Sequence, residues 1–153
     1  MWNDHYKEML RALSDEKVKY LIIGAYALSA HGFVRGTVDM DLWVMPSQEN
    51  AGAVMRALRR FGAPLFDLSE KDLSEPGTIF QIGVKPQRID IITEATGLDF
   101  EETYQRSISA SLEGMDIRIP CLDDLIRNKR ATGRLRDLAD VEELERIKAR
   151  GGA

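Results

Sequence analysis

The 153-residue chain has little cysteine and no long apolar segment, and both shortages exclude whole classes of protein. Its single cysteine, Cys121, cannot close an intrachain disulfide, which argues against a disulfide-stapled secreted domain. No apolar run approaches the roughly 20 residues that a membrane-spanning helix needs. The polar start, from Met1 to Asp4, lacks the basic and then apolar profile of a signal peptide. We therefore expect a soluble cytoplasmic protein with no membrane partner.

The chain also lacks an excess of positive charge, because 21 Lys and Arg face 25 Asp and Glu and the formal net charge is −4. Long-range attraction therefore does not draw the whole molecule onto a nucleic acid or an anionic membrane. Any polyanionic partner has to meet a local basic patch. Residues 126–136 supply such a patch, since they contain no acid and five basic side chains: Arg127, Lys129, Arg130, Arg134 and Arg136.

Apolar and capping residues predict alternating helices and strands in a single domain over residues 1–153. Apolar residues make up 44% of the chain, which suits a globular core, and no repeat or low-complexity segment divides it. A first predicted helix follows the cap Asn3 and carries Tyr6, Met9, Leu10 and Leu13. Further helices are predicted over residues 25–31, 48–61, 100–107, 123–132 and 135–148. Strands are predicted over residues 18–23, 40–44, 78–84, 88–92 and 115–119, with an irregular segment over 62–77. The fold class is α+β or mixed α/β.

Two carboxylates stand one residue apart at the start of the strand predicted over residues 40–44. Alternate residues of a strand share a face, so Asp39 and Asp41 lie on one side with Cα atoms about 6.6 Å apart. Like charges this close raise each other's proton affinity unless a cation neutralises them, and a divalent metal ion is a common remedy. The alternatives are that the two acids lie in a solvated turn or that they pair with Arg35.

A third acid, Asp90, lies in the apolar strand predicted over residues 88–92. Its isoleucine neighbours on both sides indicate a buried position, where an unpaired carboxylate is costly. Asp90 therefore requires a cation, which can be Arg88, a lysine or a metal ion. A salt bridge and a metal site remain the two alternatives.

The junction of the first predicted strand with the short helix after it has the composition of a phosphate site. The strand ends at Ile23, Gly24 and Ala25 follow, and the helix begins at once. Free backbone N–H groups and the positive end of a helix dipole at such a junction favour an anion. The alternative is a tight turn with no ligand.

Together these residues resemble the minimal nucleotidyltransferases of the polymerase-beta-like superfamily. The shared pattern is an apolar strand, Gly-Gly or Gly-Ser, a short helix, D-x-D on the next strand and an Asp on a later strand. This chain supplies Gly24-Ala25, Asp39-x-Asp41 and Asp90 in that order, with Ala25 as the departure. The residues before the D-x-D and the tail from Leu125 to Asp140 are also similar to AbiEii-type small bacterial nucleotidyltransferases.

The resemblance implies a mixed β-sheet flanked by helices, with a C-terminal helical pair at about residues 122–150. It implies transfer of a nucleoside monophosphate from an NTP to a hydroxyl, with Mg²⁺ or Mn²⁺ as cofactor. Asp39, Asp41 and Asp90 would be the catalytic, metal-binding residues, and Asp90 would also accept the proton of the attacking hydroxyl. The implied nucleotide-binding residues are Gly24, Ala25, Arg35, Thr37, Lys129 and Arg134.

Several alternatives stay open at this point. Lys129 and Arg134 can instead form salt bridges with Asp137, Asp140 and Glu142. The acceptor can be tRNA, a protein or a small alcohol, so the chain can be a toxin-like modifier with a cognate antitoxin or a modifier of the antibiotic-resistance kind. A nucleotide-binding module without catalysis is a third possibility, which Ala25 favours and the three retained acids oppose.

Overall fold

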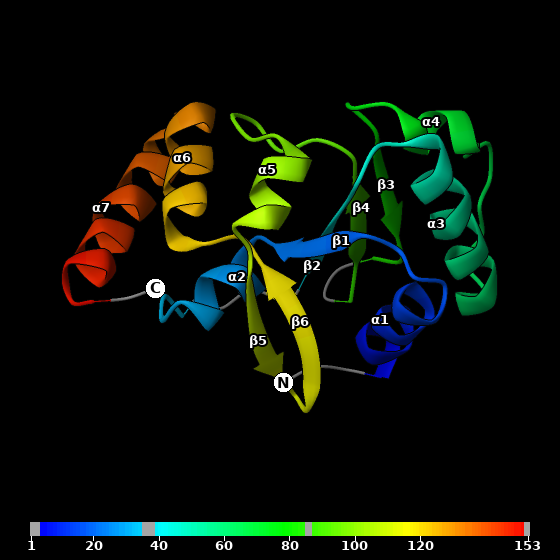
Figure 1. Ribbon diagram of the computed structural model, residues 1–153, viewed down its shortest axis with the longest axis horizontal. Coiled ribbons are helices and arrows are strands. Elements are labelled where there is room, and N and C mark those ends of the chain that lie inside the picture. Colours follow the sequence, from blue (N-terminus) through cyan, green and yellow to red (C-terminus); the bar gives the residue numbers. More distant parts are fainter. Residues whose placement is uncertain (1–3, 35–38, 85–86, 152–153) are drawn as a thin grey trace.

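The computed structural model describes residues 4–34, 39–84 and 87–151. Helices and strands alternate along this part of the chain, and Figure 1 shows their arrangement. In order they are α1 (Asp4–Asp15), β1 (Tyr20–Ile23), α2 (Ala25–Ala30), β2 (Met40–Val44), α3 (Gln48–Phe61), α4 (Glu70–Ser74), β3 (Ile79–Ile82), β4 (Ile89–Ile92), α5 (Phe100–Gln105), β5 (Ile108–Leu112), β6 (Met115–Ile119), α6 (Leu122–Thr132) and α7 (Leu135–Ala149).

The main sheet has four strands in the order β1-β2-β4-β3. β2 and β4 are parallel, whereas β1 with β2 and β3 with β4 are antiparallel. β5 and β6 form a separate antiparallel hairpin. The predicted fold class, a mixed sheet flanked by helices, is therefore confirmed. The prediction of a single domain over residues 1–153 stays a prediction.

Local sequence signals account for the well-predicted elements. β2 has the bounds that its apolar run predicted and ends before Pro46. α3 begins after Ser47, whose hydroxyl accepts a hydrogen bond from the backbone N–H of Asn50 at 3.1 Å. The same helix ends at Gly62, which adopts the left-handed conformation with φ 90°.

Two elements escaped the sequence-based prediction. Residues 62–77 are not wholly irregular, because α4 lies within them and begins with a capping box between Ser69 and Asp72. β5 was also missed, although its partner β6 was predicted. The strands predicted over 18–23 and 78–84 are shorter at their ends in the structure.

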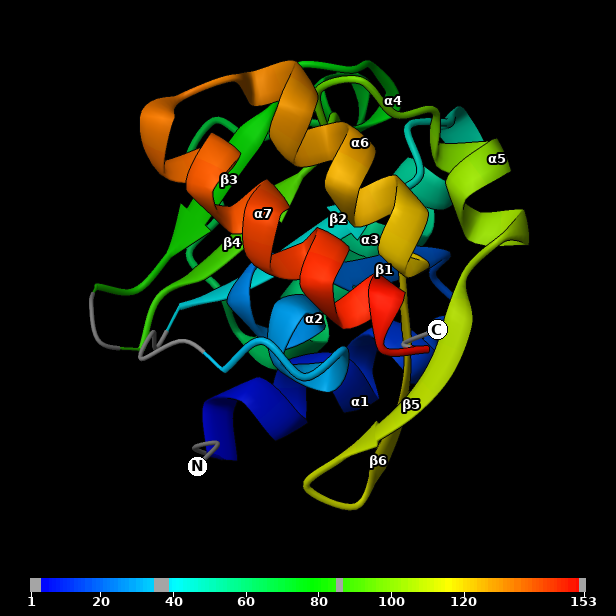
Figure 2. The same ribbon diagram turned by 90° about the vertical axis from the view of Figure 1, so that its left-hand side faces the viewer.

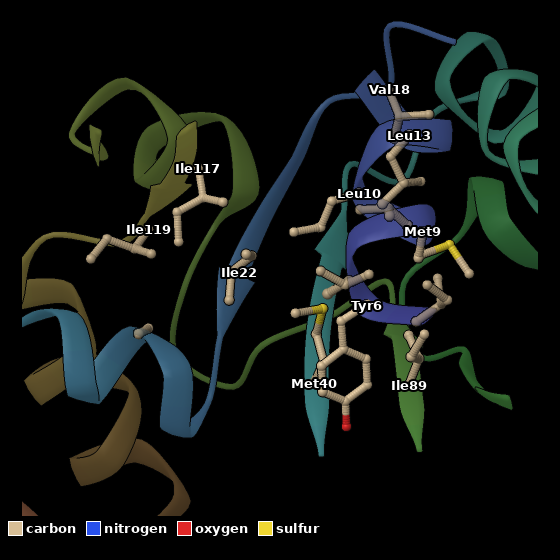
Figure 3. Close-up of a cluster of buried hydrophobic side chains, with 14 of the residues drawn as sticks. Tyr6, Met9, Leu10, Leu13, Val18, Ile22, Met40, Ile89, Ile117 and Ile119 are labelled. Carbon is tan, nitrogen blue, oxygen red and sulfur yellow. The ribbon is translucent and has the colours of Figure 1, made fainter. Parts of the chain in front are cut away.

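The main core lies on one face of the sheet, under α1 and α3. The α1 residues Tyr6, Met9, Leu10 and Leu13 are buried, as their helical spacing predicted. In Figure 3 they lie over Met40 of β2 and Ile89 of β4, while Ile117 and Ile119 of β6 approach Ile22 from the other side. Full burial of each large apolar side chain stabilises the fold by about 1.5–3 kcal/mol. The same buried cluster extends to α6 and α7.

A smaller apolar cluster lies on the opposite face, under α5. Leu21, Trp43, Ala95 and Phe100 form its buried part. The rings of Trp43 and Phe100 meet edge to face, with centroids 5.0 Å apart. Asp99 caps α5 by accepting a hydrogen bond from the N–H of Glu102 at 3.1 Å.

The predicted C-terminal helical pair is present as α6 and α7. They pack side by side in both views and are joined at Gly133, which has φ 67° (Figures 1 and 2). Within the described ranges, no helix combines the length and the apolar character needed to cross a bilayer.

Candidate active site

Three carboxylates, which we call the acidic row, rise from the sheet face that carries the α5 cluster. Asp41 of β2 stands directly opposite Asp90 of the parallel strand β4, so both side chains share a face. Asp39 precedes β2 by one residue and shares this face with Asp41 through the two-residue period. The sequence predicted that Asp39 and Asp41 share a side, and the strand register adds Asp90 beside them.

Arg88 contacts two members of the acidic row. Its Nη2 atom lies 3.3 Å from Oδ2 of Asp39 and donates to Oδ2 of Asp90, also at 3.3 Å. Its Nε atom lies 3.0 Å from Oδ1 of Asp90. Among the cations that the sequence left open for Asp90, Arg88 is therefore the partner in this structure.

This pairing leaves carboxylate oxygens of the row incompletely satisfied. Oδ1 of Asp39 is buried and has no hydrogen-bond partner among the residues that the structure describes. Oδ1 of Asp90 is within ion-pair distance of Arg88 Nε, but the two atoms are not aligned as a hydrogen bond. Buried carboxylate oxygens without good partners are costly, so the row favours a further cation.

Burial and neighbouring charges act on Asp41. Burial is the largest cause that raises the pKa of Asp41, followed by the charges of Asp90 and Asp39, and the resulting pKa is about 6. Arg88 and Lys129 oppose this shift. A bound cation would favour the ionised carboxylate in the same way.

Gly24 allows the backbone between β1 and α2 to approach Asp41. Its backbone has φ 72° and ψ −150°, a region that side-chain-bearing residues rarely adopt. A Cβ atom at this position would collide with Oδ2 of Asp41. Gly24 and Ala25 therefore lie beside the row. The close approach of Asp41 explains why residue 24 is a glycine, since a side chain there would collide with it.

Lys129 and Arg134 are both engaged with acids of α7. The Lys129 ammonium lies 3.1 Å from Oδ2 of Asp140 and 3.5 Å from Oδ1 of Asp137. Arg134 Nε donates to Oδ2 of Asp137 at 2.7 Å. The salt bridges to Asp137 and Asp140 that the sequence left as an alternative are thus present.

The exposure of these two cations differs. The side chain of Lys129 is only 20% exposed and lowers the pKa of Asp41, so its charge acts on the acidic row. That of Arg134 is 66% exposed. Glu142, the third acid proposed for these salt bridges, lies 3.8 Å from Arg146.

The remaining site predictions are limited by the described ranges. Arg35 and Thr37, predicted to bind nucleotide, lie outside the described residues. Within those residues, no three Asp, Glu, His or Cys side chains are grouped so that they could hold a metal ion as they stand. The chemistry of the row still fits a hard cation, because carboxylate oxygens are the ligands that Mg²⁺ and Mn²⁺ prefer and one of them is buried and unpaired.

Residues 4–149 match the model of a family described as a nucleotidyltransferase of unknown function, DUF6036. The chain belongs to this family. The resemblance that the sequence suggested is therefore confirmed at the level of a nucleotidyltransferase, and the finer likeness to AbiEii-type enzymes stays a prediction. No curated protein matches the chain.

Three solved structures share the fold of this nucleotidyltransferase family member. A proposed nucleotidyltransferase from Thermotoga maritima is 15% identical, with a TM-score of 0.54 over 97% of this chain and 94% of that one. The antibiotic-resistance factor ANT(2'')-Ia is 16% identical, with a TM-score of 0.57 over 95% and 88%. The lincosamide antibiotic adenylyltransferase LnuA, solved with lincomycin, is 12% identical, with a TM-score of 0.58 over 96% and 98%.

Sequence reasoning about this nucleotidyltransferase missed the double role of Arg88. It named Arg88 for Asp90 alone and Arg35 for the D-x-D, whereas Arg88 contacts both Asp39 and Asp90. The spacing Arg88-x-Asp90 carried a signal, because residues two apart on a strand share a face. The buried pair Asp137 and Asp140 was named only as an ion-pair alternative, although their spacing of three places both on one side of a helix.

Proposed function

We propose that the protein transfers a nucleoside monophosphate from an NTP to a hydroxyl acceptor, with divalent cations bound by Asp39, Asp41 and Asp90. The observation that carries this proposal is the register of β2 and β4, which sets Asp41 beside Asp90 on the face that Asp39 shares. Carboxylates this close repel each other. This repulsion destabilises a fold that has no cation between them, but it favours binding of a cation. Membership of a nucleotidyltransferase family over residues 4–149 supports it.

The side chains take distinct roles in this proposal. Mg²⁺ or Mn²⁺ bound to the three acids would stabilise charge on the attacking and leaving oxygens of the phosphoryl group. By its resemblance to the third acid of the polymerase-beta-like pattern, Asp90 would accept the proton of the attacking hydroxyl. Gly24 and Ala25 bring backbone close to Asp41 and so border the space for the phosphates.

Lys129 is the strongest candidate among the proposed phosphate ligands. Two buried carboxylates, Asp137 and Asp140, hold its ammonium group in place, while its charge acts on Asp41. A fixed ammonium near carboxylate-bound cations adds positive potential where a triphosphate would lie. Arg134, Arg35 and Thr37 complete the proposed nucleotide site.

We propose a small alcohol as the acceptor, rather than tRNA or a protein. The basic segment 126–136 would be the surface for a polyanion, yet most of its charges are paired within the chain. These pairs join Arg127 to Asp124, Lys129 to Asp137 and Asp140, Arg130 to Glu145, and Arg134 to Asp137. A small acceptor is also supported by the similar folds of ANT(2'')-Ia, an antibiotic-resistance factor, and LnuA, which was solved with lincomycin bound.

The test is a transfer assay with α-labelled NTPs and Mg²⁺, offered aminoglycosides, lincosamides, total tRNA and proteins. Label on a small alcohol supports the proposal, and label on tRNA or protein moves the acceptor to that class. NTP binding without transfer to any acceptor favours the inactive module. Asp90→Asn is the matched control: we expect NTP affinity within a few-fold of wild type and no turnover. An active Asp90→Asn protein would show that Asp90 is structural.

A further inference from the structure

Arg88 covers oxygen atoms that a metal ion would need. Both oxygens of Asp90 and one oxygen of Asp39 lie within 3.0–3.3 Å of its guanidinium nitrogens. A carboxylate oxygen offers few lone pairs, and Mg²⁺ requires oxygen ligands at about 2.0–2.1 Å in a near-octahedral arrangement. A guanidinium at hydrogen-bond distance and a metal ion at coordination distance compete for these positions.

The guanidinium balances charge in the row without completing its hydrogen bonds. Arg88 Nε and Asp90 Oδ1 are buried and poorly aligned with each other, and Asp39 Oδ1 is left without a partner in the described ranges. A structural Arg and Asp pair in this chain looks different. Arg106 donates two well-aligned hydrogen bonds, at 3.0 and 3.1 Å, to the two oxygens of the buried Asp124.

The backbone of Arg88 is anchored through its carbonyl oxygen. Its carbonyl accepts hydrogen bonds from the N–H of Met40 at 3.0 Å and from the hydroxyl of Tyr6 at 3.3 Å. Its side chain keeps 25% of its surface exposed. The main chain beside the acidic row is therefore held in place, while the side chain of Arg88 is partly exposed and contacts the carboxylates of the row.

We infer that the Arg88 guanidinium is an internal counter-ion that competes with divalent cations for Asp39 and Asp90 and leaves them when a metal ion binds. This inference rests on the proposed function, because it takes the acidic row as the metal site. Arg88 then has two effects of opposite sign. It stabilises the metal-free protein by offsetting repulsion among the acids, and it weakens metal binding, so the row loads fully only when nucleotide phosphates supply further ligands.

The test compares Mn²⁺ binding to nucleotide-free wild type and Arg88→Met, by electron paramagnetic resonance at constant ionic strength. We expect Arg88→Met to bind Mn²⁺ at least tenfold more tightly. We also expect its melting temperature to be below wild type in EDTA, with a deficit that shrinks as Mn²⁺ is added. Equal or weaker Mn²⁺ binding by the variant overturns the inference.

Arg106→Met is the matched control, because it also removes an arginine from a buried aspartate. It should lower the melting temperature equally with and without Mn²⁺ and leave Mn²⁺ affinity unchanged. If Arg88→Met does not fold, Arg88→Lys replaces it, since a lysine ammonium lacks the planar fork with which the guanidinium covers both oxygens of Asp90. Arg88→Lys should bind Mn²⁺ several-fold more tightly than wild type, and equal binding overturns the inference.

The outcomes also separate this inference from the proposed function. If wild type binds Mn²⁺ in the presence of NTP and Asp39→Asn does not, the acidic row is the metal site. Unchanged Mn²⁺ binding in Arg88→Met would then overturn only the role of Arg88. If neither wild type nor Arg88→Met binds Mn²⁺ with or without NTP, the metal site is wrong and both proposals fail.

Discussion

The two faces of the main sheet are built from alternate residues of the same strands and have opposite energetic characters. On the face under α1 and α3, Met40, Leu42 and Val44 of β2 are fully buried among apolar side chains. On the other face, Trp43 packs under α5 and Asp41 stands beside Asp90. The apolar side chains of the first face stabilise the fold, whereas repulsion between the carboxylates of the acidic row on the second face destabilises it.

This difference indicates where the fold tolerates change. A residue of the apolar face can be judged by volume and burial alone. A residue of the acidic row has to be judged by charge, because its neighbours are other carboxylates and Arg88. Four predictions test this difference.

The largest expected effect is on the apolar face. Leu42→Ala should lower the free energy of unfolding by about 2–5 kcal/mol, because it leaves a cavity at a fully buried position. Urea denaturation measures this loss. Leu42→Met, which conserves volume, should cost less than about 1.5 kcal/mol. NTP affinity of the folded Leu42→Ala protein should match wild type, and a large loss of affinity would contradict the separation of the faces.

A glycine beside the acidic row gives the next largest effect. Gly24→Ala should cost about 2–4 kcal/mol, because it combines a strained backbone with a Cβ that collides with Asp41. Gly114→Ala is the matched control, since Gly114 also has a positive φ, 80°, but open space around it. It should cost only about 1–2 kcal/mol. Thermal unfolding measures the stability lost in each variant. Equal losses in Gly24→Ala and Gly114→Ala would show that the contact with Asp41 adds no cost at Gly24.

Lys129 should contribute to both binding and stability. Lys129→Ala is expected to cost roughly 1.5–3 kcal/mol of NTP binding, with a smaller loss for NMP, because fewer phosphate charges remain. It should also lower the melting temperature, since the buried Asp140 loses its ion pair. Calorimetry with both ligands at two salt concentrations measures the binding loss. Arg134→Ala, at a position that is 66% exposed, should cost less NTP affinity than Lys129→Ala. Equal losses for NTP and NMP in Lys129→Ala would make Lys129 structural.

The smallest expected effect is a gain in stability that depends on pH. The pKa of Asp41 is about 6 in the fold against 3.8 as its ordinary value, so the folded state binds the proton more tightly. Ionised Asp41 therefore destabilises the fold increasingly as pH rises from about 4 to 6. Asp41→Asn should stabilise the metal-free protein by about 1–3 kcal/mol at pH 7.5, and the gain should vanish below about pH 4. Denaturation across this pH range measures it, and a gain independent of pH would rule out charge as the cause.

Sequence patterns sufficed wherever neighbouring residues determine the structure. The helical spacing in α1 and the apolar run of β2 identified their elements, and α3 was predicted with the bounds that it has in the structure. α4 could have been found from its capping box at Ser69 and Asp72, but five residues give little periodicity. β5 was missed although Ile108–Leu112 alternates apolar residues with Ser109 and Ser111, which is the two-residue pattern of a half-exposed strand.

The site was predictable in its members but not in its pairings. Asp39, Asp41 and Asp90 could be named from spacing and apolar context, and family resemblance grouped them. That Asp41 stands opposite Asp90, and that Arg88 lies between Asp39 and Asp90, follows from the parallel register of β2 and β4. This register depends on contacts between segments distant in sequence, which no local pattern encodes.

The parallel pairing of β2 with β4 also bears on the order in which the chain folds. Antiparallel pairing of β3 with β4 closes a short loop, whereas pairing of β2 with β4 has to bring together segments separated by α3, α4 and β3. Asp41 and Asp90 therefore first meet when this long loop closes. Because Arg88 lies on the same chain segment as Asp90, that carboxylate arrives with its own positive partner. When Asp41 and Asp90 come together, Arg88 therefore already lies beside Asp90 and offsets part of their repulsion.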